Sequence, residues 1–185
     1  LGERVRGKQW LAAASTLINK ATDAYDRMSQ TSVLTSAKLG LSVQAMNDAV
    51  KQAARDNSDF VSETSAAYDL LARSGEKDLG QIALDYKSIS EMSKVSGESV
   101  TSVAYEAIPA LKAFGLEVSD IADYEDVFMS VTRDTTMSLG EFTGFISRSA
   151  LNLKALKLDI TDTAAIFEIL NDRGIQGRQA MRVFS

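Results

Sequence analysis

The chain has 185 residues, 45 % of them hydrophobic, and a formal net charge of -5 at pH 7. It contains no cysteine and no histidine, which excludes disulfides, thiolate metal sites and the commonest general base of enzymes. The negative charge and the scattered lysines and arginines argue against binding to a nucleic-acid backbone. With a single proline and abundant Ala, Leu, Ser, Glu and Lys, the composition favours helix. We predict an all-α protein of helical hairpins, packed as an irregular bundle or a short repeat array.

Apolar residues three and four positions apart predict amphipathic helices along the whole chain. In chain order, the predicted helices are Lys8–Met28, Thr31–Leu39, Ser42–Arg55, Asp59–Ala72, Asp78–Lys94, Glu98–Phe114, Asp120–Arg133, Leu139–Leu156, Asp162–Asp172 and Gln176–Phe184. The longest uncharged stretch, Gln9 to Asn19, is far shorter than the roughly 20 apolar residues that span a membrane. The chain starts at Leu1 without a methionine or a signal peptide, so we expect a fragment of a longer protein.

The buried core is predicted by apolar stripes on these helices. The clearest stripe comprises Val100, Val103, Ala104, Ala107, Ile108, Leu111 and Phe114. Three more are Leu79, Ile82, Tyr86 and Ile89, then Ile121, Tyr124, Phe128 and Val131, and then Leu139, Phe142, Ile146 and Leu153. Because the first stripe continues past Pro109, we expect the proline to kink that helix rather than end it.

Glycines and hydroxyl residues predict where the helices end and begin. We expect left-handed glycines after the helix ends at Gly40, Gly75, Gly97, Gly115 and Gly174, since glycine adopts that geometry without strain. Expected N-caps are Ser42, Ser119, Ser138 and Thr161. Ser138 and Glu141 have the spacing of a capping box, in which each side chain binds an unpaired backbone amide of the first helical turn.

The chain also contains an internal repeat. The stretch 111–122 matches the stretch 153–164 with few non-conservative changes. Residues 39–43 give a weaker third copy of the turn. The offset between the first two copies, about 42 residues, suits a helix-turn-helix unit. Lys157 stands where the first copy has Gly115, so we expect some strain if Lys157 is left-handed.

Two charged groups are candidate binding sites. The acidic group Glu117, Asp120, Asp123, Glu125 and Asp126 would suit a divalent cation or a basic partner, but it lacks the spacing of a calcium loop. Carboxylates at a helix N-terminus are the simpler interpretation. The arginines at positions 173, 178 and 182 flank the glycines at 174 and 177. They would suit phosphate, but without Walker or dinucleotide spacing we interpret the glycines as turn residues.

Two glutamates are candidate catalytic residues, and both have a structural interpretation. Glu106 and Glu141 are candidate acids for glycoside hydrolysis, which needs a carboxylate pair. No partner stands out, so we interpret Glu106 as part of a polar helix face.

The aromatic residues are spread at core spacing: Trp10, Tyr68, Tyr86, Tyr105, Phe114, Tyr124, Phe128, Phe142 and Phe145. Phe142 and Phe145 alternate with Gly140 and Gly144, which would let another helix approach closely, within the chain or in an oligomer. We expect no catalytic, cofactor-binding or metal-binding residues.

Residues 83–185 resemble the core region of bacteriophage tail tape measure proteins of the long-tailed, non-contractile type and of related prophages. In that family an Ala- and Leu-rich helix ends in a Gly-Leu or Leu-Leu turn, followed by Ser or Thr and acidic residues, as in the stretches 114–120 and 156–162. The stretch 166–182 is similar to the closing motif, an apolar helix, an asparagine shortly before Gly-Ile-x-Gly, a small residue and arginine. The departures are Lys157 and Met181, where the family usually has glycine and smaller residues.

The resemblance implies an N-terminal helical segment at 1–75 and core-like hairpin repeats at 76–185. It implies a structural function: such proteins set tail length, occupy the tube lumen of the virion tail and leave ahead of the DNA. The implied partners are the tail tube protein, tail assembly chaperones, baseplate hub proteins and further copies of the chain, in the virion tail and in the host cytoplasm during assembly. It transfers no catalytic residues and no nucleic-acid specificity, and nothing in the sequence indicates membrane contact during ejection.

Two other classes of function stay open from the sequence. Proteins of this family sometimes carry wall-degrading enzyme domains, and an ordinary helical adaptor without a viral role would share the same composition. A compact bundle would be about a quarter as long as one continuous helix. We therefore expect two states, a folded or oligomeric hairpin assembly outside the tube and a more extended helical form inside it.

Overall fold

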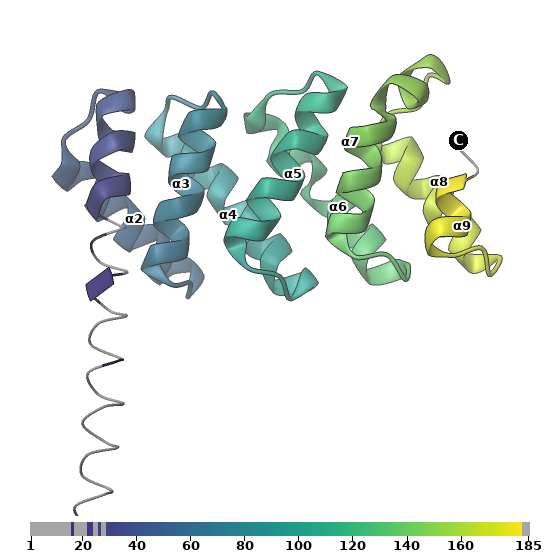
Figure 1. Cartoon of the computed structure of the whole chain (residues 1–185), viewed down its shortest axis with the longest axis horizontal. Coiled ribbons are helices and arrows are strands. Elements are labelled where there is room, and N and C mark those ends of the chain that lie inside the picture. Colours follow the sequence, from purple (N-terminus) through teal and green to yellow (C-terminus); the bar gives the residue numbers. More distant parts are fainter. Residues whose placement is uncertain (1–15, 17–21, 24–25, 27–28, 183–185) are drawn as a thin grey trace, which may run out of the picture.

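The computed structural model describes residues 29–182 and, before them, residues 16, 22–23 and 26. Within this part of the chain every regular element is helical and no strand is present. The prediction of an all-α protein built from helical hairpins is therefore confirmed, and Figure 1 shows the helices side by side in a row. No helix among the described residues is long and apolar enough to cross a membrane.

The helices follow the predicted order closely. Residues 29–39 are helical and are followed by α2 (Val43–Asn57), α3 (Val61–Ser74), α4 (Leu79–Ser96), α5 (Val100–Phe114), the short 3-10 turn η1 (Val118–Asp120), α6 (Ile121–Asp134), α7 (Leu139–Ala155), α8 (Ile160–Asp172) and α9 (Gly177–Met181). The predicted helix Lys8–Met28 lies mostly outside the described residues, as does the end of the last helix at Phe184. As expected, α5 continues through Pro109.

The helices form two layers, and from α3 to α8 each helix packs most closely on one that is two positions away in the chain. One layer contains α3, α5 and α7, and the other contains α2, α4, α6 and α8. In Figure 1, α3, α5 and α7 lie in front of α4, α6 and α8. The front helices begin at Val61, Val100 and Leu139, which are evenly spaced along the chain. The hairpins α3–α4, α5–α6 and α7–α8 are therefore successive repeats of one unit, each packed on its neighbours.

One type of turn ends most of these helices. At six turns in the described residues, the amide of a left-handed residue bonds to the carbonyl three residues back, and the next amide bonds to the carbonyl five residues before it, which is the Schellman motif. The residues in this position are Gly40, Ser58, Gly75, Gly115, Lys157 and Gly174, all with positive φ. Gly97 is also left-handed. All five predicted glycines are confirmed, and Lys157 has φ 59°, which meets the condition under which we expected strain.

The predicted N-caps are half right. Ser42 accepts from the amide of Ala45 at 3.1 Å, and Ser138 forms the expected capping box with Glu141. Ser119 is wrong as a cap because it lies inside η1, and the box there is made by Glu117 and Asp120.

Thr161 is wrong for the same reason. It lies inside α8, and the box at that end is made by Asp159 and Asp162. In both copies of the repeat an acidic side chain two residues earlier binds the free amides of the first turn.

The core lies between the two layers and contains the predicted stripes. Ile108 is 3 % exposed, and Phe128, Phe142 and Phe167 are 1 % exposed or less. Their rings meet edge to face, with centroids 6.2 Å apart for Phe128–Phe142 and 5.9 Å for Phe142–Phe167. The core prediction is wrong for Tyr105, which is 63 % exposed on α5.

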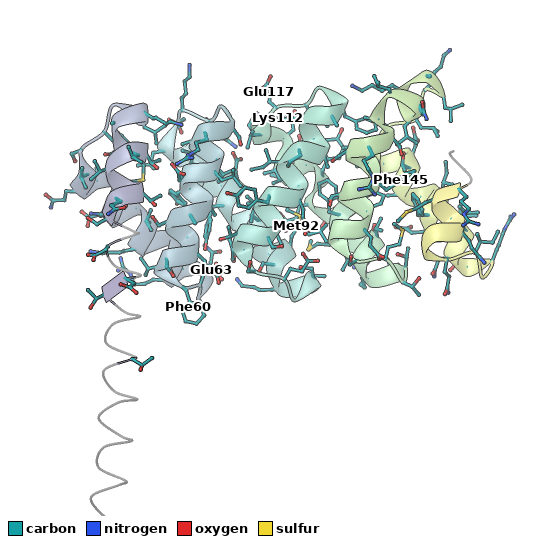
Figure 2. All side chains as sticks on the ribbon, viewed as in Figure 1. Phe60, Glu63, Met92, Lys112, Glu117 and Phe145 are labelled. Atoms are coloured by element: carbon teal, nitrogen blue, oxygen red, sulfur yellow. The ribbon has the colours of Figure 1, made fainter. Side chains whose placement is uncertain are left out.

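Lysines join the ends of successive front helices. The ammonium group of Lys112 at the end of α5 donates to the carbonyl of Ser74 at the end of α3. The ammonium of Lys154 at the end of α7 donates to the carbonyl of Ala113 at 2.9 Å. Figure 2 shows Lys112 near Glu117 at one end of the helices, whereas Phe60 lies at the other. Each lysine thus binds a helix-end carbonyl of the preceding repeat, one of the groups that a helix leaves unpaired.

Candidate functional site

The acidic group does not form a cation site. Glu117 and Asp120 bind backbone amides in their capping box, with the Glu117 amide 2.8 Å from Asp120 Oδ2. Asp123 and Asp126 are exposed on α6, and Glu125 is half-buried. No group of three or more possible metal-ligating residues occurs among the described residues. The interpretation as acidic residues at a helix start is confirmed for Glu117, Asp120 and Asp123, the last of which lies in the first turn of α6.

Glu125 instead bonds to a carboxyl group of the neighbouring helix. Its side chain hydrogen-bonds to Glu91 on α4 and to Ser88. Burial, followed by the contact with Glu91, raises the pKa of Glu125, whereas the hydrogen bond from Glu125 lowers the pKa of Glu91. The two carboxyl groups thus meet between α4 and α6 in the back layer, where their contact raises one pKa and lowers the other.

The glycines near the C-terminus form a turn, as expected. Gly174 has φ 78°, and the amide of Ile175 bonds to the carbonyl of Leu170 at 2.8 Å, closing α8. Arg173 is exposed at the end of α8 and Arg182 is exposed after α9. The side chain of Arg178 lies outside the described part. The Gly174 turn is thus a helix ending with the same bonds as the other turns.

Glu106 and Glu141 do not form a catalytic pair. The carboxylate of Glu141 accepts from the amide of Ser138 at 3.1 Å in the capping box. Glu106 lies half-buried on α5 with its carboxylate against Gly140 of α7. A Cβ atom on Gly140 would be 2.8 Å from Glu106 Oε1. The prediction that Glu106 belongs to a polar helix face is therefore wrong, since neighbouring α7 covers it.

The carboxyl group of Glu106 is in an unfavourable place for a charge. The hydroxyl of Ser102 donates to Oε1 at 3.3 Å, whereas Oε2 is buried and has no hydrogen-bond partner among the described residues. Burial, followed by the neighbouring carboxyl of Glu98, raises the pKa of Glu106 to about 7. The sequence alone indicated nothing of this burial.

A second buried carboxyl was missed entirely. Asp85 on α4 is 0 % exposed. Gln81 donates to its Oδ1 at 2.8 Å, and Oδ2 has no partner in the described chain. Burial raises the pKa of Asp85 to about 6. A signal did exist, because Asp85 is three residues after Ile82 and four before Ile89, the spacing of the apolar stripe.

A buried polar network joins α3 and α4. The carboxylate of Asp59 accepts from the hydroxyls of Tyr86 and Ser90, each at 2.6 Å, and Tyr86 is also bonded to Thr64 at 2.8 Å. Burial, and then the bond to Asp59, raises the pKa of Tyr86, which therefore stays a neutral donor. These bonds fix how the two helices of this hairpin pack and leave no reactive group free.

Two of the open grooves among the described residues are further candidates for binding. One, of about 490 Å³, lies over α3 and α5 and is lined by Leu70, Tyr105, Pro109 and Lys112 among others. The other, of about 500 Å³, is lined by residues of α2, α3 and α4, mostly small or polar, including Ala53, Asp56 and Lys87. Grooves of this type accept side chains of another protein or a small apolar molecule. They hold no arrangement of acid, base and nucleophile.

The fold thus defines a two-layer array of helical hairpins whose distinctive features are repeated turns and contacts between repeats. No protein-family model matches the chain, and no solved structure matches it. Among curated proteins, a stretch of 90 residues, or 49 % of the chain, is 30 % identical to the tape measure protein of Pneumococcus phage Dp-1. The match spans 8 % of the length of that protein.

Proposed function

We propose that the chain is a structural segment of a phage tail tape measure protein, which contributes to tail length determination and tail assembly and is released when DNA is ejected. The observation that carries this proposal is the 30 % identity over 90 residues with the tape measure protein of phage Dp-1. The repeated helical hairpins and the resemblance of residues 83–185 to the family's core region support it independently.

The proposed role is not catalytic. Glu141 is engaged in a capping box, and Glu106 lies half-buried against Gly140 of α7, with the carboxyl of Glu98, not that of Glu141, as its acidic neighbour. A zymogram on purified cell wall tests this directly: we expect no clearing, and Glu106→Gln and Glu141→Gln should change nothing. Clearing that either substitution abolishes would make the segment an enzyme.

The proposed location is the lumen of the virion tail, and the host cytoplasm during assembly. The proposed partners are the tail tube protein, tail assembly chaperones, baseplate hub proteins and further copies of the chain. Exposed apolar side chains such as Tyr105 and Leu151, 63 % and 84 % exposed, support contacts with other proteins. Light scattering at high concentration should give oligomers, and a clean monomer would contradict self-association.

An in-frame deletion of Ser96 to Ser185 in the phage that encodes the chain tests the role as a ruler. If the chain is extended as helix in the tail, tails should shorten by about 135 Å, at 1.5 Å per residue. A helical adaptor, the alternative function, predicts tails of unchanged length. Electron microscopy of negatively stained virions measures the difference.

A substitution that keeps chain length separates the two expected states. Ile108→Asp should disrupt the compact array without removing any residue, since Ile108 is 3 % exposed in the core. Tails that keep their length with this substitution would support an extended form as the measuring state. Filled tails in which cryo-electron microscopy finds the same compact array would contradict the extended form.

A further inference from the structure

We propose that Asp85 and Glu106 make the packing of the array depend on protons: the repeats pack tightly while both carboxyl groups are protonated, and they loosen when the protons leave. The inference rests on the fold and not on the proposed function. Asp85 belongs to α4 in the back layer, and Glu106 to α5 in the front layer. Ionisation therefore acts on both layers and in two successive hairpins.

No positively charged side chain among the described residues contributes to the pKa of Asp85. Asp85 is 0 % exposed, and the side chain that donates to it, Gln81, is neutral. The charged groups that act on it from neighbouring segments are Glu76, in the turn before α4, and Asp120, at the end of η1. Both are acidic, so they oppose its ionisation as burial does. An ionised Asp85 would leave Oδ2 buried without a donor, which is costly in a packed interior.

Glu106, in the front layer, also has neutral and acidic neighbours, although it is half-buried where Asp85 is fully buried. The helix that covers it, α7, presents Gly140, which has no side chain and no charge. The segment before α5 contributes Glu98, an acid, and α5 itself contributes the neutral Ser102. The contacts of α5 with α7 and of α4 with α6 are the most extensive in the array. Each carboxyl is thus on a helix that makes one of the two largest contacts between repeats.

The direction of the pH effect follows from the raised pKa values. A carboxyl with a higher pKa in the folded state binds its proton more tightly there than in the unfolded chain. Its stabilising contribution is complete below the ordinary pKa of about 4. It declines as the pH rises and is lost above the folded values, which are about 6 for Asp85 and about 7 for Glu106. Stability from these two groups therefore falls between about pH 4 and about pH 7, and most of that fall lies between pH 5 and pH 8.

The test is urea unfolding of the whole chain at pH 5 and pH 8, followed by circular dichroism. The variants are Asp85→Asn, Glu106→Gln and the double variant. Each replaces a carboxyl group by a neutral amide that does not ionise in this pH range. The matched control is Asp48→Asn, which removes a charge from an exposed position on α2. Relative to the double variant, the unfolding constant of the wild type should rise at least about tenfold more between the two pH values. The control should follow the wild type.

Equal pH dependence in the wild type and the double variant would overturn the proposal. If Asp85→Asn does not fold, Glu106→Gln alone and carbon-13 NMR titration of the wild-type side-chain carboxyls decide the matter. Two carboxyl resonances that titrate between about pH 5.5 and 7.5, one of them missing in Glu106→Gln, would support it. Titration of every carboxyl below about pH 5 would overturn it.

Discussion

The two copies of the repeated turn, after α5 and after α7, have the same hydrogen bonds but different residues at the critical position. The amide of Leu116 bonds to the carbonyl of Leu111 at 3.1 Å, and that of Leu158 to Leu153 at 2.9 Å. The left-handed residue is Gly115 in the first copy and Lys157 in the second. The difference teaches that the turn is maintained by these hydrogen bonds and by Leu116 and Leu158, which pack against the core. A glycine at the left-handed position only lowers the conformational free energy of the turn.

The copies also differ in how the next helix starts. In the first copy, η1 forms between the turn and α6, whereas α8 begins directly after Asp159. The capping boxes nevertheless match, with Glu117 and Asp120 in one copy and Asp159 and Asp162 in the other. The turns and the capping boxes of the two copies are therefore separated by the same number of residues. The starts of the following helices, Ile121 and Ile160, are separated by fewer residues, because η1 precedes α6.

The largest expected effect comes from the core beside the first turn. Ile108→Asp places an unpaired carboxylate in the packing one turn before Leu111 and should cost several kcal/mol, against a total stability of roughly 5 to 15 kcal/mol. Loss of the cooperative thermal transition of residues 100–182 is expected. Retained cooperative melting would show that the stripe on α5 is not essential to the array.

Replacing the glycine should expose the strain of the turn. Gly115→Ala adds a Cβ at φ 80°, a conformation that costs L-residues about 1 to 2 kcal/mol. Space is not the obstacle, because the nearest atom to the new Cβ, Lys154 Nζ, would be 3.9 Å away. Urea denaturation should show a lower midpoint, and an unchanged midpoint would mean that the turn relaxes without strain.

The reverse change in the second copy should have the opposite sign. Lys157→Gly removes a side chain at φ 59° and should stabilise the protein by up to about 1 kcal/mol, since glycine's extra freedom in the unfolded chain offsets part of the gain. A higher midpoint in the same denaturation assay is expected. A lower midpoint would mean that the Lys157 side chain contributes more than its backbone costs.

The smallest expected effect concerns the lysines that connect the repeats. Lys154→Met keeps most of the apolar stem but removes the bond to the Ala113 carbonyl and the ammonium 5.5 Å from the centre of the Phe114 ring. A loss of about 0.5 to 1 kcal/mol is expected, because the bond is exposed. Lys112→Met should behave alike at the Ser74 carbonyl, and unequal losses would separate the two junctions.

The turns and the core could be predicted because both depend on patterns of residues that are close together in the sequence. A glycine after an apolar period predicts a left-handed helix end, and the internal repeat identified Lys157 as the residue equivalent to Gly115, although its left-handed φ is known only from the structure. The errors at Ser119 and Thr161 arose because hydroxyl and acidic residues both suit an N-cap, and the acidic ones lie nearer the turn. Only the hydrogen bonds decide between them.

Burial of charge could not be predicted in the same way. The Glu106 carboxyl is covered by α7, and that contact depends on how two hairpins pack and not on the pattern of α5 alone. Tyr105 is the converse case, an aromatic residue with core-like spacing that faces outward because the neighbouring helices leave it uncovered. Asp85 is different, since its position within the stripe of α4 was visible and its charge argued against burial.

The neighbour-only packing of the hairpins has a mechanical consequence. A force applied along the row of repeats acts on one junction at a time, because removing the terminal hairpin leaves the contacts of the others intact. The array should therefore peel apart stepwise from an end, each hairpin of about 39 residues releasing roughly 130 Å of chain. A protein of this architecture can be drawn out through a narrow opening without first melting as a whole.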